Sequence, residues 1–282
     1  MQTSLIAILV NPAAGKGKSI RLSVWLEKQL ISKHIPCTIF KSQWPGSFEE
    51  FSDIWIIGGD GTINYFINHY PDCDLPLVLF KGGTGNDFAW KLYGDISDAE
   101  QLELVLTASP KYIDAGNCNG ILFMNCLGAG FDGEVLKSMN AIRYIGGHFG
   151  YLLAVIKKIF FFREHQFSIT TADEKWNEKF LLVIITNSSR AGGGFMVAPH
   201  AEITDGKLNM LLCKKLSVWQ RLKYLPVIEK GRHLQLPFII HRLGKLFSIQ
   251  CDEEIAVQMD GELLFAKELT VEVLTQKFLF RY

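Results

Sequence analysis

Glycines next to carboxylate and hydroxyl side chains recur in this 282-residue chain, in a pattern typical of phosphate and metal chemistry. The clearest case, Gly58-Gly59-Asp60-Gly61-Thr62, directly follows the apolar run 54–57. Glycine lets a backbone approach a phosphate closely, and it tolerates the positive φ of a tight turn. Asp60 would repel a phosphate unless it held Mg²⁺ or bonded a hydroxyl. We interpret this segment as a phosphate-binding strand–loop–helix; the alternative is an ordinary βα turn with an acid at the helix start.

Two further loops could share that chemistry. The segment 81–88, Lys-Gly-Gly-Thr-Gly-Asn-Asp-Phe, also follows an apolar run, so it and 58–62 should converge at the carboxyl edge of a parallel sheet. The segment 11–19 lies after the first strand and resembles a P-loop, but Pro12 stands where that motif needs glycine. A loop that opens a helix can still present N–H groups to an anion, although a plain polar turn is equally compatible.

The second half of the chain carries acid–glycine pairs whose ordinary meaning is a turn. Asp205-Gly206 and Asp260-Gly261-Glu262 each lie beside strand-like runs. Such pairs most often close hairpins, and the residues alone do not raise them above that interpretation.

The elements that must position these loops change character near residue 110. Before it, strand-like runs at 5–10, 35–40, 54–57 and 75–80 alternate with helical patterns at 19–33, 63–70 and 98–107, which predicts a parallel α/β sheet. After it, short strand-like runs separated by turn residues predict an antiparallel sandwich or barrel, with helices near 149–162 and 217–230. We expect a nucleotide-binding domain over 1–118 and a second domain over 119–282, with the last strand, about 269–282, able to pack back on the first.

The composition of the chain limits its possible partners and cellular compartment. Lys+Arg and Asp+Glu both number 29, so bulk charge offers no attraction to nucleic acid. The six cysteines include no C-x-x-C pair, and a reducing cytoplasm is the simpler setting. The apolar zone 149–162 is interrupted by Lys157 and Lys158 and is too short to span a bilayer. Its composition fits either an interfacial helix, peripheral at the inner membrane face, or a core helix against the sandwich.

Five motifs, taken in order, resemble the diacylglycerol kinase catalytic-domain family, which includes bacterial lipid kinases and the sphingosine and ceramide kinases. They are Asn11-Pro12 with Gly15, the segments 58–62, 83–89 and 128–132, and Asp260-Gly261-Glu262. The resemblance spans nearly the whole chain. It implies an NAD kinase-like, Rossmann-like α/β domain, a C-terminal β-sandwich, and ATP with Mg²⁺ between them.

The resemblance also implies residue roles. Glu262 would accept the proton of a lipid hydroxyl, with Asp260 beside it, and Asp60 would organise metal or acceptor. Asp205 would ligate a structural Mg²⁺ by its side chain, and Glu202 and Lys207 by their carbonyls. The implied ATP-binding set is Asn11, Ser42, Gly59, Asp60, Gly61, Thr62, Asn64, Gly83, Thr84, Gly85, Asn86 and Asp87.

Two departures from the family pattern stand out: Tyr65 replaces the usual glutamate after Asn64, and Trp90 replaces the usual arginine after Ala89. The hypothesis is an ATP- and Mg²⁺-dependent lipid kinase. The acceptor is left open among diacylglycerol, sphingoid base, ceramide, monoacylglycerol and prenol-like alcohols. The alternatives are an NAD kinase, which shares the Gly-Gly-Asp-Gly element, and a nucleotide- or lipid-binding regulator that has lost catalysis.

Overall fold

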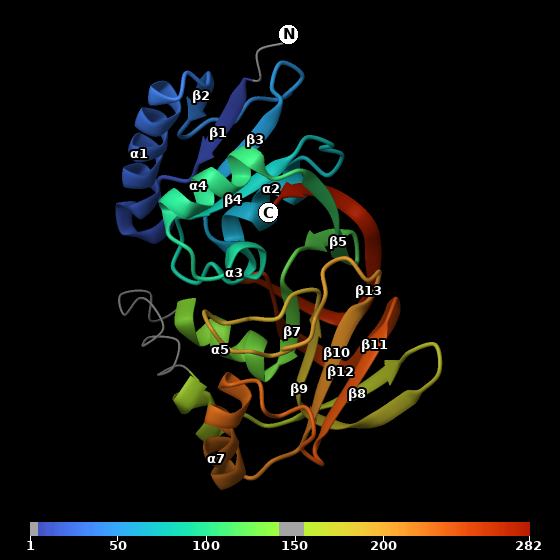
Figure 1. Cartoon of the computed structure of the whole chain (residues 1–282). Coiled ribbons are helices and arrows are strands. Elements are labelled where there is room, and N and C mark those ends of the chain that lie inside the picture. The colour runs from blue at the N-terminus through green and yellow to red at the C-terminus, as the bar shows by residue number, and fades with distance from the viewer. Residues whose placement is uncertain (1–4, 141–154) are drawn as a thin grey trace. The chain divides into compact units, whose positions relative to one another are not determined.

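A computed structural model of the chain describes residues 5–140 and 155–282, and the chain divides into two compact units (Figure 1). The first unit comprises residues 1–113 and 276–282, and the second comprises 114–275. The terminal segment 276–282 therefore groups with the first unit, and the unit boundary lies five residues before the expected one. Strands β5 (Pro110–Cys118) and β13 (Glu262–Arg281) each run from one unit into the other.

The first unit is built on a parallel sheet. Strands β1 (Ile6–Val10), β2 (Cys37–Phe40), β3 (Asp53–Gly58) and β4 (Leu77–Lys81) pair in the order β2-β1-β3-β4, every pair parallel. Phe280 near the end of β13 extends the sheet by pairing with Leu77, again parallel. All five residues of β1 and all six of β3 are buried, as expected of parallel strands covered on both faces.

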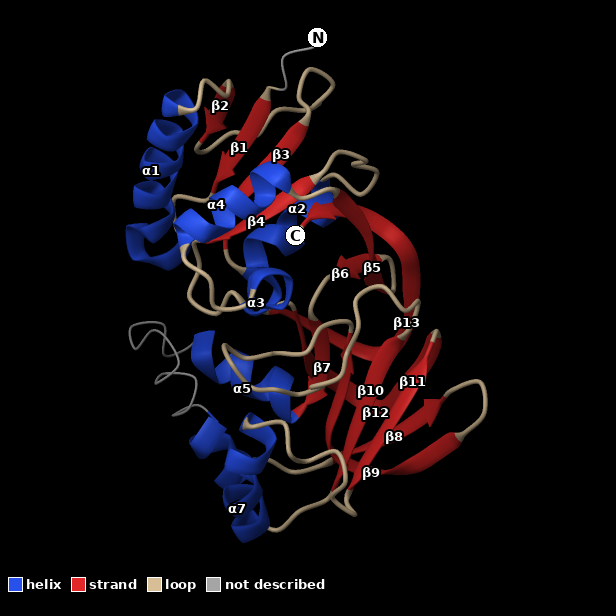
Figure 2. Cartoon of the chain, viewed as in Figure 1, coloured by secondary structure: helices blue, strands red, loops and turns tan. Residues whose placement is uncertain are grey.

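Helices cover this sheet (Figure 2). They are α1 (Lys18–Ser32), α2 (Asp60–His69), α3 (Asp87–Tyr93) and α4 (Asp98–Thr107), after a short 3₁₀ turn η1 (Ala14–Gly17). Helix α4 begins with a complete capping box, in which the Ser97 hydroxyl accepts the Glu100 N–H and the Glu100 carboxylate accepts the Ser97 N–H. The alternation predicted from the sequence is thus present, and α3 is an element that the sequence analysis missed.

The second unit is antiparallel and strand-rich. Its strands are β6 (Ile121–Phe123), β7 (Cys126–Gly130), β8 (His165–Thr170), β9 (Lys175–Thr186), β10 (Leu208–Lys214), β11 (Ile239–Gly244) and β12 (Leu246–Met259), with most of β5 and β13. Strands β9 and β12 are long enough to pair with β8 along one half and with β7 along the other. Strand β12 runs without interruption from Leu246 to Met259, with a register shift between Gln250 and Ile255.

In the described part of this unit, the helical segments beside these strands are α5 (Phe131–Asn140), residues 155–161, and α7 (Val218–Glu229). The buried Val155 and Ile159 pack with Val135 of α5, and α7 contributes Val218 and Leu222 to the same cluster. The predicted helix at 149–162 lies partly outside the described residues, while its described part is helical as far as 161. Among the described residues, no helix is both long and apolar enough to cross a membrane.

Candidate active-site residues in the two units

Three loops meet at the carboxyl edge of the parallel sheet. Strands β3 and β4 are neighbours, and both the Gly82 and the Gly83 N–H donate to the Gly58 carbonyl, at 2.9 and 3.0 Å. A Cβ on Gly83 would lie 2.4 Å from the Cα of Gly59, and a Cβ on Gly15 would lie 2.2 Å from the Gly82 carbonyl oxygen. Only glycine permits approaches this close. The predicted convergence of 58–62 with 81–88 is confirmed, and the 11–19 loop joins them.

Thr62 links the loop 11–19 to the loop 58–62. Its hydroxyl oxygen accepts the Asn11 side-chain N–H at 2.9 Å and the Gly59 N–H at 3.3 Å. The Thr62 N–H in turn donates to the Gly59 carbonyl at 2.9 Å, which closes the first turn of α2. Asn11 and Thr62 therefore hold the backbone geometry of this turn.

Asp60 links the loop 58–62 to the loop 81–88. Its two carboxylate oxygens accept the N–H groups of Asp87 at 3.2 Å and Phe88 at 2.9 Å, at the start of α3. Burial raises the pKa of Asp60, and the hydrogen bonds from Phe88 and Asp87 oppose that rise. A cation beside the carboxylate would favour its charged form further. Asp60 thus holds the starts of α2 and α3 together.

The loop 81–88 is closed by Asn86, whose backbone is in the left-handed region at φ 57°. Its side chain accepts the Gly83 N–H at 2.8 Å and donates to the Gly83 carbonyl at 2.9 Å. Thr84, at the loop tip, is exposed, as is Ser42 after β2, so both hydroxyls are available to a ligand. Asn64 and Asp87 are buried beneath the loops at 7% and 3% exposure.

The electrostatic balance at this edge suits an anion. Lys16 and Lys18 are exposed on the first loop, while the carboxylate of Asp60 is engaged by backbone N–H groups. The N-terminal end of α2, a helix of ten residues, adds the positive end of its dipole. Glycine N–H groups, a helix start and lysines are groups that bind phosphate anions in proteins, which makes this edge the candidate phosphate site.

The two residues that depart from the family pattern both lie near these loops. Tyr65 is 57% exposed and stacks on His69 one turn further along α2, with ring centroids 5.4 Å apart. The Trp90 indole N–H donates to Asp95 at 3.0 Å, so it is bound within the first unit. Neither replaces the charge of the residue it stands for.

In the second unit, Asp260 and Glu262 have contrasting surroundings. Asp260 is 2% exposed, and its carboxylate accepts three backbone N–H groups, from Met124 at 2.7 Å, Asn125 at 2.9 Å and Cys126 at 2.8 Å. Asp260 and Gly261, at φ 48° and 90°, form the two-residue turn between β12 and β13. Glu262, by contrast, is exposed at the first position of β13. The turn interpretation is confirmed for Asp260-Gly261, and the Glu262 carboxylate is exposed to solvent.

The expected Mg²⁺ loop is anchored by a residue that the sequence analysis missed, Asp114. This aspartate is 1% exposed, accepts the Gly206 N–H at 2.7 Å, and donates its own N–H to the Ile203 carbonyl at 2.7 Å. The Asp205 carboxylate accepts the Lys207 N–H at 3.0 Å. The sequence did carry a signal for Asp114, because it is the single charged residue in the strand-like run 112–115.

The donor chemistry of this loop fits a hard cation in part. Asp114 and Asp205 supply carboxylate oxygens on either side of Gly206, and the loop adds carbonyls; oxygen ligands with one or two carboxylates are what Mg²⁺ takes in proteins. Glu202, Asp205 and Lys207 are all exposed. Within 5–140 and 155–282, however, no group of three or more His, Cys, Asp or Glu side chains is positioned to enclose an ion. A metal here would keep much of its water shell.

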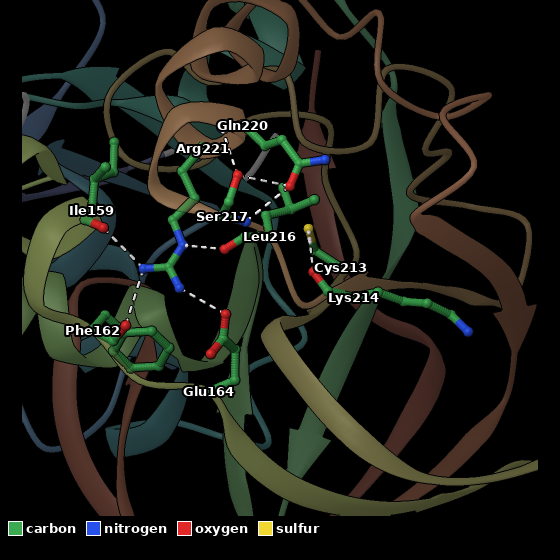
Figure 3. Close-up of polar contacts among 9 residues, drawn as sticks. All are labelled: Ile159, Phe162, Glu164, Cys213, Lys214, Leu216, Ser217, Gln220 and Arg221. Atoms are coloured by element: carbon green, nitrogen blue, oxygen red, sulfur yellow. Dashed lines mark hydrogen bonds and ion pairs between the residues drawn. The ribbon is translucent and has the colours of Figure 1, made fainter.

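The second unit also contains an apolar cavity. It has a volume of about 90 Å³ and lies among α5, residues 155–161, β9, the loop 191–197, β10 and α7. Its lining is almost wholly aliphatic and aromatic, and includes Phe131, Ile159, Leu181, Phe195 and Leu225. This volume is below the roughly 300–1,000 Å³ of typical small-molecule sites. The lining suits apolar groups, with Asp132 and Arg221 as its two charged members. Arg221 is held there by an ion pair with Glu164 at 2.7 Å, in which both side chains are less than a tenth exposed (Figure 3).

Comparison with known proteins gives two family matches. Residues 6–118 match the model described as diacylglycerol kinase catalytic domain. Residues 125–278 match the model described as YegS C-terminal NAD kinase beta sandwich-like domain. Together they cover both units and the segments carrying the candidate residues.

Individual relatives agree. A protein of Shewanella frigidimarina named "Probable lipid kinase YegS-like" is 31% identical over 231 residues, covering 79% of this chain and 74% of that protein. A protein of Bacillus subtilis named diacylglycerol kinase is 25% identical and covers 77% and 73%.

Two solved structures share the fold. A crystal structure of a diacylglycerol kinase from Bacillus anthracis aligns at a TM-score of 0.74 with 22% identity, covering 99% of this chain and 97% of that one. An NAD kinase from Archaeoglobus fulgidus, solved with ATP, aligns at 0.56 with 12% identity, covering 99% and 93%.

Proposed function

The chain belongs to the diacylglycerol kinase catalytic-domain family and is a kinase, and from that premise we propose that it transfers the γ-phosphoryl group of ATP to a hydroxyl of a lipid. One observation carries the choice of a lipid acceptor: the apolar cavity in the second unit. An acceptor such as NAD is charged and polar throughout and would gain nothing from such a lining. A diacylglycerol, a sphingoid base or a ceramide would bury hydrocarbon there, at about 25 cal/mol per Å² removed from water.

The three converging loops of the first unit are the proposed phosphate site. Their glycines bring backbone N–H groups close to the phosphates, with the exposed Thr84 hydroxyl and Lys16 beside them. Ser42, exposed after β2, is proposed to contact the rest of the nucleotide. Asp60 would face the magnesium that accompanies ATP, because a carboxylate beside polyphosphate is otherwise repelled.

Magnesium would supply charge neutralisation of the phosphates and, at the Asp205 loop, structural support. The residues proposed to hold the structural ion are Asp205 by its side chain and Glu202 and Lys207 by their carbonyls. Asp114 would keep that loop in place through its bond to the Gly206 N–H.

Glu262 is the proposed general base. The acceptor oxygen attacks the γ-phosphorus, the bond from that phosphorus to the β–γ bridging oxygen breaks, and ADP leaves. The hydroxyl proton passes to the Glu262 carboxylate, which is exposed and therefore available. General-base assistance of this kind contributes about 10²- to 10⁴-fold in rate. Asp260 is a positioning residue, since its carboxylate oxygens already accept three backbone N–H groups.

The test offers purified enzyme, Mg²⁺ and γ-labelled ATP two acceptors in parallel, a total lipid extract and NAD. We expect the label in the chloroform-soluble fraction, in a product that mass spectrometry identifies as a phosphorylated lipid. Glu262→Gln should lower that rate by about 10²-fold or more while leaving ATP binding unchanged. Glu268→Gln, an exposed glutamate on the same strand, is the matched control.

Other outcomes decide against the proposal. Label in NADP and none in lipid would make the protein an NAD kinase. ATP binding without transfer to either acceptor would support a regulator that has lost catalysis. Unchanged lipid phosphorylation by the Glu262→Gln variant would remove the role assigned to Glu262.

A further inference from the structure

A group of aromatic rings lies on the solvent side of α2, the helix that begins at the glycine loop 58–62. The Tyr65 ring is 57% exposed and stacks on the His69 ring, with centroids 5.4 Å apart and planes 12° apart. Trp44, in the segment that follows β2, contacts the Tyr65 ring edge to face, also at 5.4 Å between centroids. Rings in mutual contact on one exposed surface mark a candidate contact site.

These rings are adjacent to the candidate phosphate site. After Asp60, the residues of α2 that are not buried are Gly61, Tyr65, Asn68 and His69. Residues four apart share a helix face, so Tyr65 lies next to Gly61 of the glycine loop, about 6 Å further along the helix axis. A nucleotide whose phosphates bind at the start of α2 therefore has these rings within reach of its base.

The segment that carries Trp44 is fixed against the same helix. The Tyr70 hydroxyl donates to the Pro45 carbonyl at 2.8 Å, and the buried Phe48 packs edge to face on the Tyr70 ring at 5.0 Å. Trp44 also contacts Phe66, with ring centroids 6.2 Å apart. The pair formed by Trp44 and Tyr65 is therefore held in place without a ligand, which lowers the cost of ordering these side chains on binding.

Tyrosine and glutamate at position 65 would recognise a base in different ways. A carboxylate only accepts hydrogen bonds, so it favours adenine, whose amino group donates, over guanine, whose O6 accepts. An aromatic ring stacks on either base, because every base has a π face. Tyr65, which stands where the family pattern has glutamate, therefore exchanges a selective contact for a tolerant one.

We propose that Tyr65 and Trp44 form the base-binding surface of the nucleotide site, and that they hold the purine by stacking and so accept guanine as well as adenine nucleotides. The inference rests on the proposed function, in that it takes the glycine loops to bind the phosphates of ATP. The lipid acceptor fits this surface less well, because the apolar cavity belongs to the second unit, whereas these rings share a helix face with a phosphate loop.

The test is calorimetric binding of ADP, GDP and inorganic tripolyphosphate, each with Mg²⁺ and without a lipid acceptor. The wild type should bind ADP and GDP with dissociation constants within about five-fold of each other. Tyr65→Ala should weaken both nucleotides by about five-fold to 150-fold, which is what one stacked base contributes, and should leave tripolyphosphate binding unchanged.

Two further variants separate stacking from other roles of the side chain. Tyr65→Phe keeps the ring and should bind ADP and GDP as the wild type does, whereas Tyr65→Glu should bind ADP more tightly than GDP. The matched control is Tyr112→Ala, which removes a tyrosine of β5 that is 51% exposed and should leave all three affinities unchanged.

Equal ADP affinity in Tyr65→Ala and the wild type would overturn the proposal. An equal loss of tripolyphosphate and ADP binding would overturn it too, because Tyr65 would then support the phosphate loop and not the base. So would a wild type that binds ADP at least 100-fold more tightly than GDP. Binding of ADP through Tyr65 with no transfer to any lipid would count against the proposed function and leave this surface standing.

Discussion

Replacing Asp260 by asparagine is expected to destabilise the second unit, even though the neighbouring Glu262 can be changed at almost no cost in stability. The Asp260 carboxylate accepts the N–H groups of Met124, Asn125 and Cys126, all at 2.7 to 2.9 Å. Those three residues are 0%, 4% and 2% exposed, so water cannot replace a lost partner.

The magnitude follows from the way the bonds divide between the two oxygens. Oδ1 accepts from Asn125 and Cys126, and Oδ2 accepts from Met124. Asparagine can keep one oxygen toward the first two N–H groups, but its amide NH₂ then faces the Met124 N–H, donor against donor. One hydrogen bond to a charged acceptor is lost, at about 1.5–3 kcal/mol, and the other two lose their charge assistance. We expect a total of about 3–5 kcal/mol, and more for Asp260→Ala.

The assay is urea denaturation of the full chain, combined with hydrogen exchange of the Met124–Cys126 amides. Hydrogen exchange is included because a protein of two units need not unfold in one step. Glu262→Gln serves as the internal comparison and should stay within about 0.5 kcal/mol of the wild type, as exposed substitutions do. Equal midpoints and equal amide protection in the two variants would refute the assignment of Asp260 as a positioning residue.

Three further expectations follow from local geometry. Gly83→Ala should weaken ADP binding at least ten-fold in calorimetry, since the new Cβ would lie 2.4 Å from the Cα of Gly59 in the neighbouring loop. Gly46→Ala is the control and should leave ADP binding unchanged, because its Cβ would have nothing within 4 Å. Equal losses of affinity in the two variants would refute the close-approach argument. Arg221→Met breaks a buried ion pair and should cost about 3–5 kcal/mol in denaturant unfolding. The exposed ion pair of Arg242 with Glu174 is the comparison, and Arg242→Met should lower the free energy of unfolding by about 0–1 kcal/mol. Equal losses of stability in the two variants would contradict the role given to burial. The cysteines at 118, 126, 213 and 251 are buried, and burial raises the pKa of Cys213 to about 12. Native protein should therefore react with a thiol reagent at two of its six cysteines. Reaction at all six would contradict that burial.

The sequence predicted the convergence of the glycine loops because close approach of two backbones depends on local rules. Glycine is required where two loops approach within van der Waals distance, as at Gly59 and Gly83, and that requirement is visible as residue type. The apolar runs before each loop likewise predicted parallel strands, because strands buried on both faces have no polar alternation. Motif and strand together placed both loops at one sheet edge.

The features that the sequence did not predict depend on partners far along the chain. The Asp260 carboxylate is satisfied by backbone groups about 135 residues earlier, and no local pattern distinguishes it from the acid at Glu262. Asp114 likewise binds a loop 92 residues away. The cavity is assembled from several separate segments between residues 131 and 228, and its existence depends on packing that residue order does not state. Short α3 was missed because its seven residues give too little periodicity.

The central claim, transfer of the γ-phosphoryl group of ATP to a lipid hydroxyl, is tested most directly by one rate measurement on two proteins. The quantity is the initial rate at which label from γ-labelled ATP enters chloroform-soluble product, with Mg²⁺ present, for the wild type and for Glu262→Gln. The account predicts steady incorporation by the wild type and a rate lower by about 10²-fold or more in the variant. No incorporation by the wild type with any lipid extract, or equal rates in the two proteins, would contradict it.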